Sequence, residues 1–285
     1  MVIQQGIHPG LGMAEYHNWK LDKAKLIDGP ISCSMLKAFA PNPFAWRWTP
    51  DREQTASMAK GSLFDAALTD PASLEENYVI SKYTDFRCKE AQEWRKEITE
   101  QGKIAVSEED LHHAIKAAEK CHAHKVAGSL LDGAQFQVGV VGEIGGIPAK
   151  CLLDILPDEE SLVDYKTIST GLGDESIRKA IGQYKYHWQA AFYKTLFNKV
   201  SEDRYAEEFK LIFQDVQTLE VRVVTMSDDA MACGTQSVKV ALKEFAKCAH
   251  KGIRSRYEET DDSIDLMPYH AMSEDEWQIA MEGDD

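Results

Sequence analysis

The chain has 285 residues, of which 44% are apolar and 28% charged, and these proportions are typical of a globular protein with a substantial core. No apolar run approaches the ~20 residues of a membrane span, and the first residues do not resemble a secretory signal, so we expect a cytoplasmic protein without a membrane partner. The net charge of −15 disfavours phosphate binding over the whole surface, and the six scattered cysteines include no Cys-x-x-Cys metal-binding pair.

The first part of the chain predicts an N-terminal helical portion over about residues 30–131. Residues 1–30 are polar and contain glycine, which favours an extended arm ahead of it. Ser32 or Ser34 is placed to cap a short helix, because a serine side chain accepts a bond from a free backbone N–H in the first turn. Three further helices are expected: one that ends at Pro71, one over 85–102, and one long helix from Ser107 to about 131.

Two features of this portion are candidates for function. Trp46 and Trp48 flank Arg47, and aromatic side chains beside a base either stack on a DNA end or anchor the core. We favour the core for the two tryptophans and phosphate binding for Arg47. In the helix before Pro71, Asp65 lies within an apolar stretch, where it is either an inward-facing metal ligand or a side chain on the solvated face.

Residues 145–167 predict a β-hairpin, because two apolar runs flank a turn rich in proline and acidic residues. The first run holds Asp154, and the second holds Asp164 and Lys166. Side chains alternate along a strand, so Asp164 and Lys166 project from one face and Tyr165 from the other. Two carboxylates and one ammonium are therefore expected to meet at one end of the hairpin.

Buried charges without partners cost several kcal/mol each, so such a cluster is either mutually compensated or holds a metal. Carboxylate oxygens suit Mg²⁺ or Mn²⁺, and a lysine beside the metal can orient or deprotonate a water and stabilise charge on a phosphate. The pattern indicates metal-assisted phosphodiester hydrolysis, although a bare Asp-x-Lys is also typical of a surface ion pair. Glu143, near the end of the strand that begins at Phe136, is a further candidate ligand or water-orienting group.

A long helix is predicted over about residues 174–198, after a Gly-Leu-Gly break. Gln189 and Tyr193 are four residues apart and share one face of this helix. Two strands and a helix over about 228–250 complete a predicted catalytic core of about residues 135–250. Three basic residues of the long helix are candidates for DNA binding: Arg178, Lys179 and Lys185.

Residues 257–285 form an acidic tail with eleven Asp and Glu residues and no Lys or Arg. Because the whole chain has a net charge of −15, residues 1–256 carry only −4. A nearly balanced body can present a local basic groove, and bound metal ions add positive charge where phosphate lies. We therefore expect one catalytic domain over residues 1–256, followed by the tail.

The order of these elements resembles the PD-(D/E)xK nuclease superfamily, and within it the exonuclease VIII (RecE-type) nucleases of phages and prophages. More distant similarity is to lambda-type exonuclease and RecB-type nuclease domains. The resemblance implies a restriction-endonuclease-like α/β fold, with a mixed central β-sheet flanked by helices and an N-terminal helical portion over the active-site cleft. It rests on the blocks ISCSMLKAFAPNPFAW, KGSLFDAALTDP, IPAKCLLDIL with LVDYKT, YHWQAAFY and AKCAHKG, which span nearly the whole chain.

The resemblance also assigns roles to residues of the hairpin. It implies that Asp154 and Asp164 hold divalent metal ions and that the backbone carbonyl of Tyr165 is an additional ligand. It implies that Lys166 acts on the nucleophilic water.

Two helical motifs complete the implied site. Gln189 and Tyr193 match the Q-x-x-x-Y motif, which in the family helps to position the active site and the DNA strand. The family helix commonly reads G-x-x-x-H, whereas this chain has Asp65 four residues after Gly61. We expect Asp65 to replace the histidine as a metal ligand and to favour harder ions.

The activity that the resemblance implies is that of a Mg²⁺-dependent exodeoxyribonuclease, with Mn²⁺ as a substitute, acting 5′ to 3′ on the ends of linear double-stranded DNA. Its partners would be a single-strand annealing protein of the RecT or Bet type and further copies of the chain in a homo-oligomeric ring, in the cytoplasm of a bacterial host. Two alternatives remain open: a structure-specific or single-strand DNA endonuclease, and a non-catalytic DNA-end-binding recombination scaffold.

Overall fold

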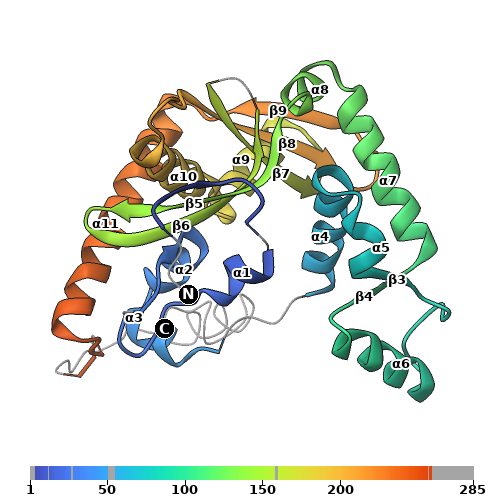
Figure 1. Cartoon of the computed structure of the whole chain (residues 1–285), viewed down its shortest axis with the longest axis horizontal. Helices are drawn as coiled ribbons and strands as arrows, with labels where there is room; N and C mark the ends of the chain where they lie inside the picture. The colour runs from blue at the N-terminus through green and yellow to red at the C-terminus, as the bar shows by residue number, and fades with distance from the viewer. Residues whose placement is uncertain are drawn as a thin grey trace, which may run out of the picture. The chain divides into compact units, whose positions relative to one another are not determined.

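A mixed β-sheet lies at the centre of the chain, and helices cover both of its faces (Figure 1). The computed structural model describes residues 4–11, 13–26, 28–50, 55–157, 160–255 and 257–258. The strands of this described part are β1 (Gly6–His8), β2 (Ile31–Ser32), β3 (Tyr78–Ile80), β4 (Ile104–Val106), β5 (Gln135–Ile144), β6 (Ile147–Leu156), β7 (Ser161–Ile168), β8 (Glu208–Asp215) and β9 (Val221–Thr225). The central sheet has the order β1-β5-β6-β7-β8-β9, with β2 beside β6, and β3 and β4 form a separate parallel pair.

The helices arise where the sequence supplies caps and apolar faces. Ser32, Thr55 and Ser107 each accept a bond from a backbone N–H of the first turn, as N-cap residues do. The described helices are α1 (Met13–Asn18), α2 (Cys33–Phe39), α3 (Pro43–Trp48), α4 (Ala56–Thr69), α5 (Ser73–Asn77), α6 (Lys89–Glu100), α7 (Glu108–Ala123), α8 (Lys125–Leu131), α9 (Asp174–Gln183), α10 (Tyr186–Val200) and α11 (Asp228–Lys251).

Strand pairing changes from antiparallel to parallel at the middle of the sheet. β5 and β6 form a long antiparallel hairpin, whose turn uses Gly145 and Gly146 at φ values of 61° and 78° that favour glycine. β6 and β7 are registered at one pair only, Ile155 with Val163. β7 is then parallel to β8 along its whole length, and α9 and α10 make the crossover between them.

The two faces of the sheet have different coverings (Figure 1). On one face, α4, α7 and α8 bury Ile155, Val163, Tyr165 and Ile212 in an apolar cluster. On the other, α10 packs against β5 and β6, and α2 and α11 pack against α10. The predicted restriction-endonuclease-like class, a mixed sheet flanked by helices with an N-terminal helical portion, is confirmed.

Two helices that the sequence predicts as continuous are each divided. The helix expected from Ser107 to about 131 breaks at His124, whose Nδ1 accepts a bond from the backbone N–H of Ala127 and so caps α8. The helix expected over 174–198 breaks at residues 184–185, where Lys185 has a left-handed φ of 53°. Neither break contains glycine or proline, so no local composition signals it.

Two other predictions, for the N-terminal arm and for the two tryptophans, are only partly right. The arm predicted ahead of residue 30 is extended at β1, which joins the edge of the sheet beside β5, but it also contains helix α1 and so is not extended throughout. Trp46 is a core residue, but the same prediction is wrong for Trp48, which is 67% exposed.

The described chain contains no helix with the length and apolarity needed to cross a bilayer. Residues Met1–Gly252 form one compact unit and Ile253–Asp285 a second. The acidic tail predicted for residues 257–285 lies outside the described residues from 259 onwards. The predicted limit of the catalytic domain at residue 256 therefore stays a prediction.

Candidate active site

The site begins where β6 and β7 separate. Asp154 directly precedes the single registered pair Ile155–Val163, and Asp164 directly follows it. Because the two strands diverge beyond that pair, both carboxylates fit between them. The side chain of Asp164 is buried, with 1% exposed, and that of Asp154 is partly buried, with 19% exposed.

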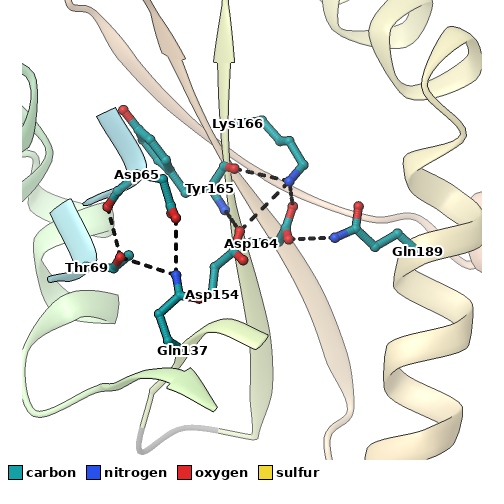
Figure 2. A network of polar contacts seen from close by, with 8 residues as sticks. All are labelled: Asp65, Thr69, Gln137, Asp154, Asp164, Tyr165, Lys166 and Gln189. Atoms are coloured by element: carbon teal, nitrogen blue, oxygen red, sulfur yellow. Dashed lines mark hydrogen bonds and ion pairs between the residues drawn. The ribbon is translucent and has the colours of Figure 1, made fainter. Parts of the chain in front are cut away.

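Lys166 binds both carboxylates (Figure 2). Its Nζ is 2.5 Å from Oδ2 of Asp164 and 3.9 Å from Oδ2 of Asp154. The same Nζ donates to the backbone carbonyl of Tyr165 at 3.2 Å. The predicted meeting of two carboxylates and one ammonium on one face of β7 is therefore what the structure contains.

Tyr165 separates the site from the core. Its backbone N–H donates to Oδ2 of Asp154 at 3.2 Å, which orients that carboxylate. Its side chain points to the opposite face, where the hydroxyl donates to Oε1 of the buried Gln214 at 2.5 Å. This is the alternation expected along a strand.

Gln189 and Tyr193 come from α10 on the side of Lys166. The amide of Gln189 donates to Oδ1 of Asp164 at 2.7 Å (Figure 2). Tyr193, one turn later, packs its ring 6.4 Å from that of Phe209, and burial raises the pKa of its phenol. Gln189 thus contacts the cluster directly, whereas Tyr193 packs in the layer behind it.

Asp65 reaches the site from α4, on the other side of Asp154 (Figure 2). Its Oδ2 accepts a bond of 3.2 Å from the amide of Gln137, which also lies 3.3 Å from the hydroxyl of Thr69. Asp65 therefore faces inward, and it is not on the solvated face.

Gln137 was not among the sequence-predicted site residues. It lies in β5, between the registered pairs Phe136–Ile155 and Val138–Leu153, and so opposite Asp154. Its φ of 52° is unusual for a residue other than glycine. The sequence around Gln137 does not predict this conformation. Only the tertiary contact with Asp65 identifies Gln137 as a residue of the site.

The charges of the cluster shift one another's pKa values. Burial, and after it the charge of Asp164, raise the pKa of Asp154 well above its ordinary value. Burial raises the pKa of Asp65 to about 6, and the Lys166 ammonium limits that rise. Burial lowers the pKa of Lys166, but the two carboxylates outweigh it and the pKa ends above its ordinary value. Three carboxylates around one ammonium leave an excess of negative charge.

The excess of negative charge fits a hard divalent cation. Such cations take carboxylate and carbonyl oxygens and often bind through one or two carboxylates and waters. In the described part of the chain no three His, Cys, Asp or Glu side chains gather into a ready-made metal site. Within the same residues, however, Oδ2 of Asp164 is buried with the Lys166 ammonium as its partner, and Oδ1 of Asp65 is buried without a hydrogen-bond donor. A cation between Asp65, Asp154 and Asp164 would satisfy such oxygens.

The structure does not bring Glu143 to this cluster, and its assignment as a ligand is corrected. Glu143 pairs with Pro148 beside the β5–β6 turn, six residues along β5 from Gln137, and its side chain is exposed. Strand residues rise by ~3.3 Å each, so Glu143 is roughly 20 Å from the acids. Glu143 is close in sequence to the predicted hairpin, but β5 carries it away from the site.

The four predicted DNA-binding residues lie in different settings. Lys185 is at the α9–α10 break, with its Nζ 4.7 Å from the ring of Trp188. Arg178 and Lys179 are exposed on α9, where Arg178 already pairs with Asp174 at 3.4 Å.

Arg47 lies on α3, away from these helices in the sequence. Its guanidinium carbon is 5.2 Å from the ring of Trp48, and its Nε is buried without a hydrogen-bond partner among the described residues. No contact joins these four side chains into one patch, so their role in binding DNA stays a prediction.

Comparison with known proteins assigns a family. Residues 32–265 match the model of a PDDEXK-like domain of unknown function, DUF3799. The chain belongs to this family. The match includes α4, the strands β6 and β7 and helix α10, so all the elements of the PDDEXK-like site are covered. The fold and the acidic cluster together support a nuclease. The chain has no match among the curated proteins.

Solved structures were compared with this fold as well. A proposed exonuclease of Eubacterium rectale is similar with a TM-score of 0.58 and 17% identity, over 90% of this chain and 95% of that one. An alkaline exonuclease of Laribacter hongkongensis aligns with a TM-score of 0.34 and 13% identity, over 82% of this chain and 95% of that one. The first similarity supports the fold, and the second is too low to do so.

Proposed function

We propose that this chain is a metal-dependent exodeoxyribonuclease that degrades linear double-stranded DNA from its ends. The observation that carries the proposal is the contact of Lys166 with Asp164 and Asp154, at 2.5 Å and 3.9 Å, where two strands of a PDDEXK-like fold diverge. Two carboxylates can hold a divalent ion, and an ammonium beside them can stabilise negative charge that develops on a phosphate.

The residues that would hold a divalent ion, Mg²⁺ with Mn²⁺ as a substitute, are Asp154, Asp164, the carbonyl of Tyr165 and Asp65. When bound, the ion would neutralise phosphate charge and lower the pKa of a bound water. PDDEXK-like nucleases generally use such ions.

Three side chains of the protein would have further roles in the reaction. Lys166, held between two carboxylates, is placed to orient the attacking water and to stabilise negative charge that develops on the phosphate. Gln189 orients the carboxylate of Asp164 by its bond of 2.7 Å. Tyr193 lies on the same face of α10 as Gln189, and its ring packs against Phe209 of β8.

The finer parts of the proposal are supported by the resemblance to RecE-type nucleases. They are 5′ to 3′ polarity, production of 3′ single strands for a RecT- or Bet-type annealing partner in phage recombination, and a homo-oligomeric ring that encloses DNA. A ring with a basic interior and an acidic exterior would reconcile DNA binding with a net charge of −15.

The test is digestion of a linear duplex and of its closed-circular form, with Mg²⁺ or with EDTA, by the wild type and by Lys166→Ala. We expect the wild type to degrade only the linear form and only with metal. Loss of Lys166 should reduce the rate by about 100-fold or more, because the group that stabilises transition-state charge is removed. Labels on each 5′ and 3′ end would then give polarity.

Lys96→Ala is the matched control, since Lys96 is an exposed lysine that pairs with Glu100 on α6, away from the proposed site. Its rate should equal that of the wild type. Cleavage of the closed-circular DNA would show that the chain is an endonuclease and would refute this proposal. Binding of DNA ends without cleavage would instead indicate a non-catalytic recombination scaffold.

A further inference from the structure

An aromatic surface begins at the α9–α10 break and ends at the lysine of the active site. The ring of Tyr186 lies 5.4 Å from Nζ of Lys166. The ring of Tyr184 stacks on Tyr186, with 5.6 Å between centroids and 28° between planes. Tyr184 is 55% exposed, so more than half of its surface is not used in packing. One aromatic ring therefore separates an exposed ring from the reacting centre.

The break holds this surface in a defined position. Lys185 adopts a left-handed conformation, which is unfavourable for an L-residue other than glycine. From α2, Nζ of Lys37 donates to the carbonyl of Tyr184 at 3.1 Å and lies 5.9 Å from the Tyr186 ring. A continuous helix would carry residue 184 away from Tyr186, so the break is what makes the two rings stack.

The surface is also positively charged. In the described part of the chain, Lys37 and Lys185 have no carboxylate within ion-pair distance, unlike the surface lysines of α6. Lys37 contacts a carbonyl, and Lys185 contacts the face of Trp188. Two ammonium groups beside an exposed aromatic ring are a combination that binds single-stranded nucleic acid, in which bases stack on rings and phosphates pair with cations.

We propose that Tyr184 and Tyr186, with Lys37 and Lys185, form a binding subsite for the nucleotide next to the scissile phosphate. An unpaired base stacks on the exposed side of Tyr184, and the lysines bind the adjoining phosphates. Since every base has a π-face, the subsite accepts any sequence, and it favours an end whose terminal pair has opened. This inference rests on the proposed function, because it places the reacting phosphate at Lys166.

The test uses the full chain and a linear duplex that carries 2-aminopurine in its terminal nucleotides, whose fluorescence is quenched by stacking. Binding is measured with Ca²⁺ in place of Mg²⁺, and cleavage is measured with Mg²⁺. The variants are Tyr184→Ala, which removes the ring, and Tyr184→Trp, which replaces it with another. Tyr205→Ala is the control, because Tyr205 is 61% exposed and lies in the loop between α10 and β8.

We expect Tyr184→Ala to weaken binding or raise KM by roughly 5- to 100-fold and to lose the quenching, with kcat nearly unchanged. Tyr184→Trp should restore both, and Tyr205→Ala should behave as wild type. Lys185→Gln should lower the slope of log affinity against log salt by about 1, as loss of one phosphate contact does.

Three results overturn the subsite. If the wild type cleaves the duplex and Tyr184→Ala has unchanged KM and quenching, the subsite is refuted while the nuclease stands. If the full chain neither binds nor cleaves DNA, both the subsite and the proposed function fall. A parallel loss in Tyr184→Ala and Tyr184→Trp would show that the residue serves the fold, and it would also refute the subsite.

Discussion

Gln137 connects Asp65 of α4 to the strand position opposite Asp154. Its backbone is opposite Asp154, and its amide donates to Asp65 and lies beside Thr69. An amide in this position sets the direction of Asp65, and such outer contacts typically contribute 10- to 100-fold to metal affinity or activity. We therefore expect Gln137→Ala to raise the Mg²⁺ concentration for half-maximal cleavage by about 10-fold or more.

The measurement for Gln137 is a Mg²⁺ titration of duplex cleavage, combined with a melting curve in EDTA. Gln137→Gly is the matched control for the backbone, since glycine tolerates the φ of 52° but also lacks the amide. Both variants should show the same metal defect. If the metal requirement stayed at the wild-type value in both, Gln137 would have no part in positioning Asp65.

Asp65 is expected to destabilise the metal-free protein at neutral pH. Burial raises its pKa from 3.8 to about 6, so the folded state binds more protons than the unfolded state between these values. The stability of the metal-free protein therefore falls as pH rises through this window. Asp65→Asn keeps an oxygen for Gln137 but cannot ionise, so it should be more stable than the wild type above pH 6.

The check for Asp65→Asn is the melting temperature in EDTA from pH 4 to pH 7.5. A gain of roughly 2–4 °C at pH 7 corresponds to about 1 kcal/mol for a chain of this size. The gain should vanish below about pH 4, and Mg²⁺ should stabilise the wild type more than the variant. A variant with equal or lower stability at pH 7 would contradict the burial of a charged Asp65.

At the scale of elements, the contact between α10 and α11 holds Gln189 in place. A Cβ on Gly234 of α11 would lie 2.1 Å from the carbonyl oxygen of His187 and 3.2 Å from Cβ of Ala191, both on α10. Backbone cannot yield as a flexible side chain does, so Gly234→Ala must displace α10. Overpacking of this kind typically costs ~1–3 kcal/mol. We expect a melting temperature lower by several degrees and reduced cleavage.

Gly182→Ala is the matched control for Gly234→Ala. Gly182 lies in α9, and an added Cβ there would meet no atom within 4 Å. Alanine is favoured over glycine in a helix by roughly 0.5–1 kcal/mol, so this variant should be as stable as the wild type or more stable. Equal melting temperatures for the two variants would mean that α10 and α11 are less closely packed than described.

At the scale of the whole molecule, charge is distributed unequally along the chain. Residues 257–285 contribute eleven of the acidic groups, so the chain ending at residue 256 carries −4 and the full chain −15. Removing the tail should tighten binding to DNA and speed association at 50 mM salt. The difference should shrink near 1 M salt, where the Debye length falls to ~3 Å.

The measurement for the tail is affinity against salt for the full chain, the chain ending at residue 256, and a full chain whose eleven tail acids are replaced by amides. If charge is the cause, the amide chain should match the truncated one. Identical affinities and salt slopes for all three would show that the tail does not act on DNA. A tail effect that persists in the amide chain would indicate steric blocking.

Much of the fold could be predicted because its signals are local. The alternation of Asp164, Tyr165 and Lys166 follows from strand geometry, and the caps at Ser32 and Ser107 follow from side chains near free N–H groups. The breaks at His124 and Lys185 could not be predicted, because a histidine cap and a left-handed lysine are imposed by packing. Local helix propensity does not predict a helix break that is set by tertiary contacts.

The sequence by itself determined the chemical inventory of the site: two hairpin acids, one lysine on the face of Asp164, and a glutamine on a later helix. Only the tertiary structure decided which other groups join them. It placed Asp65 and Gln137 beside the acids and left Glu143 at the far end of β5. The reason is that strand periodicity fixes the direction of neighbouring side chains, whereas contacts between distant elements depend on where strands diverge and helices pack.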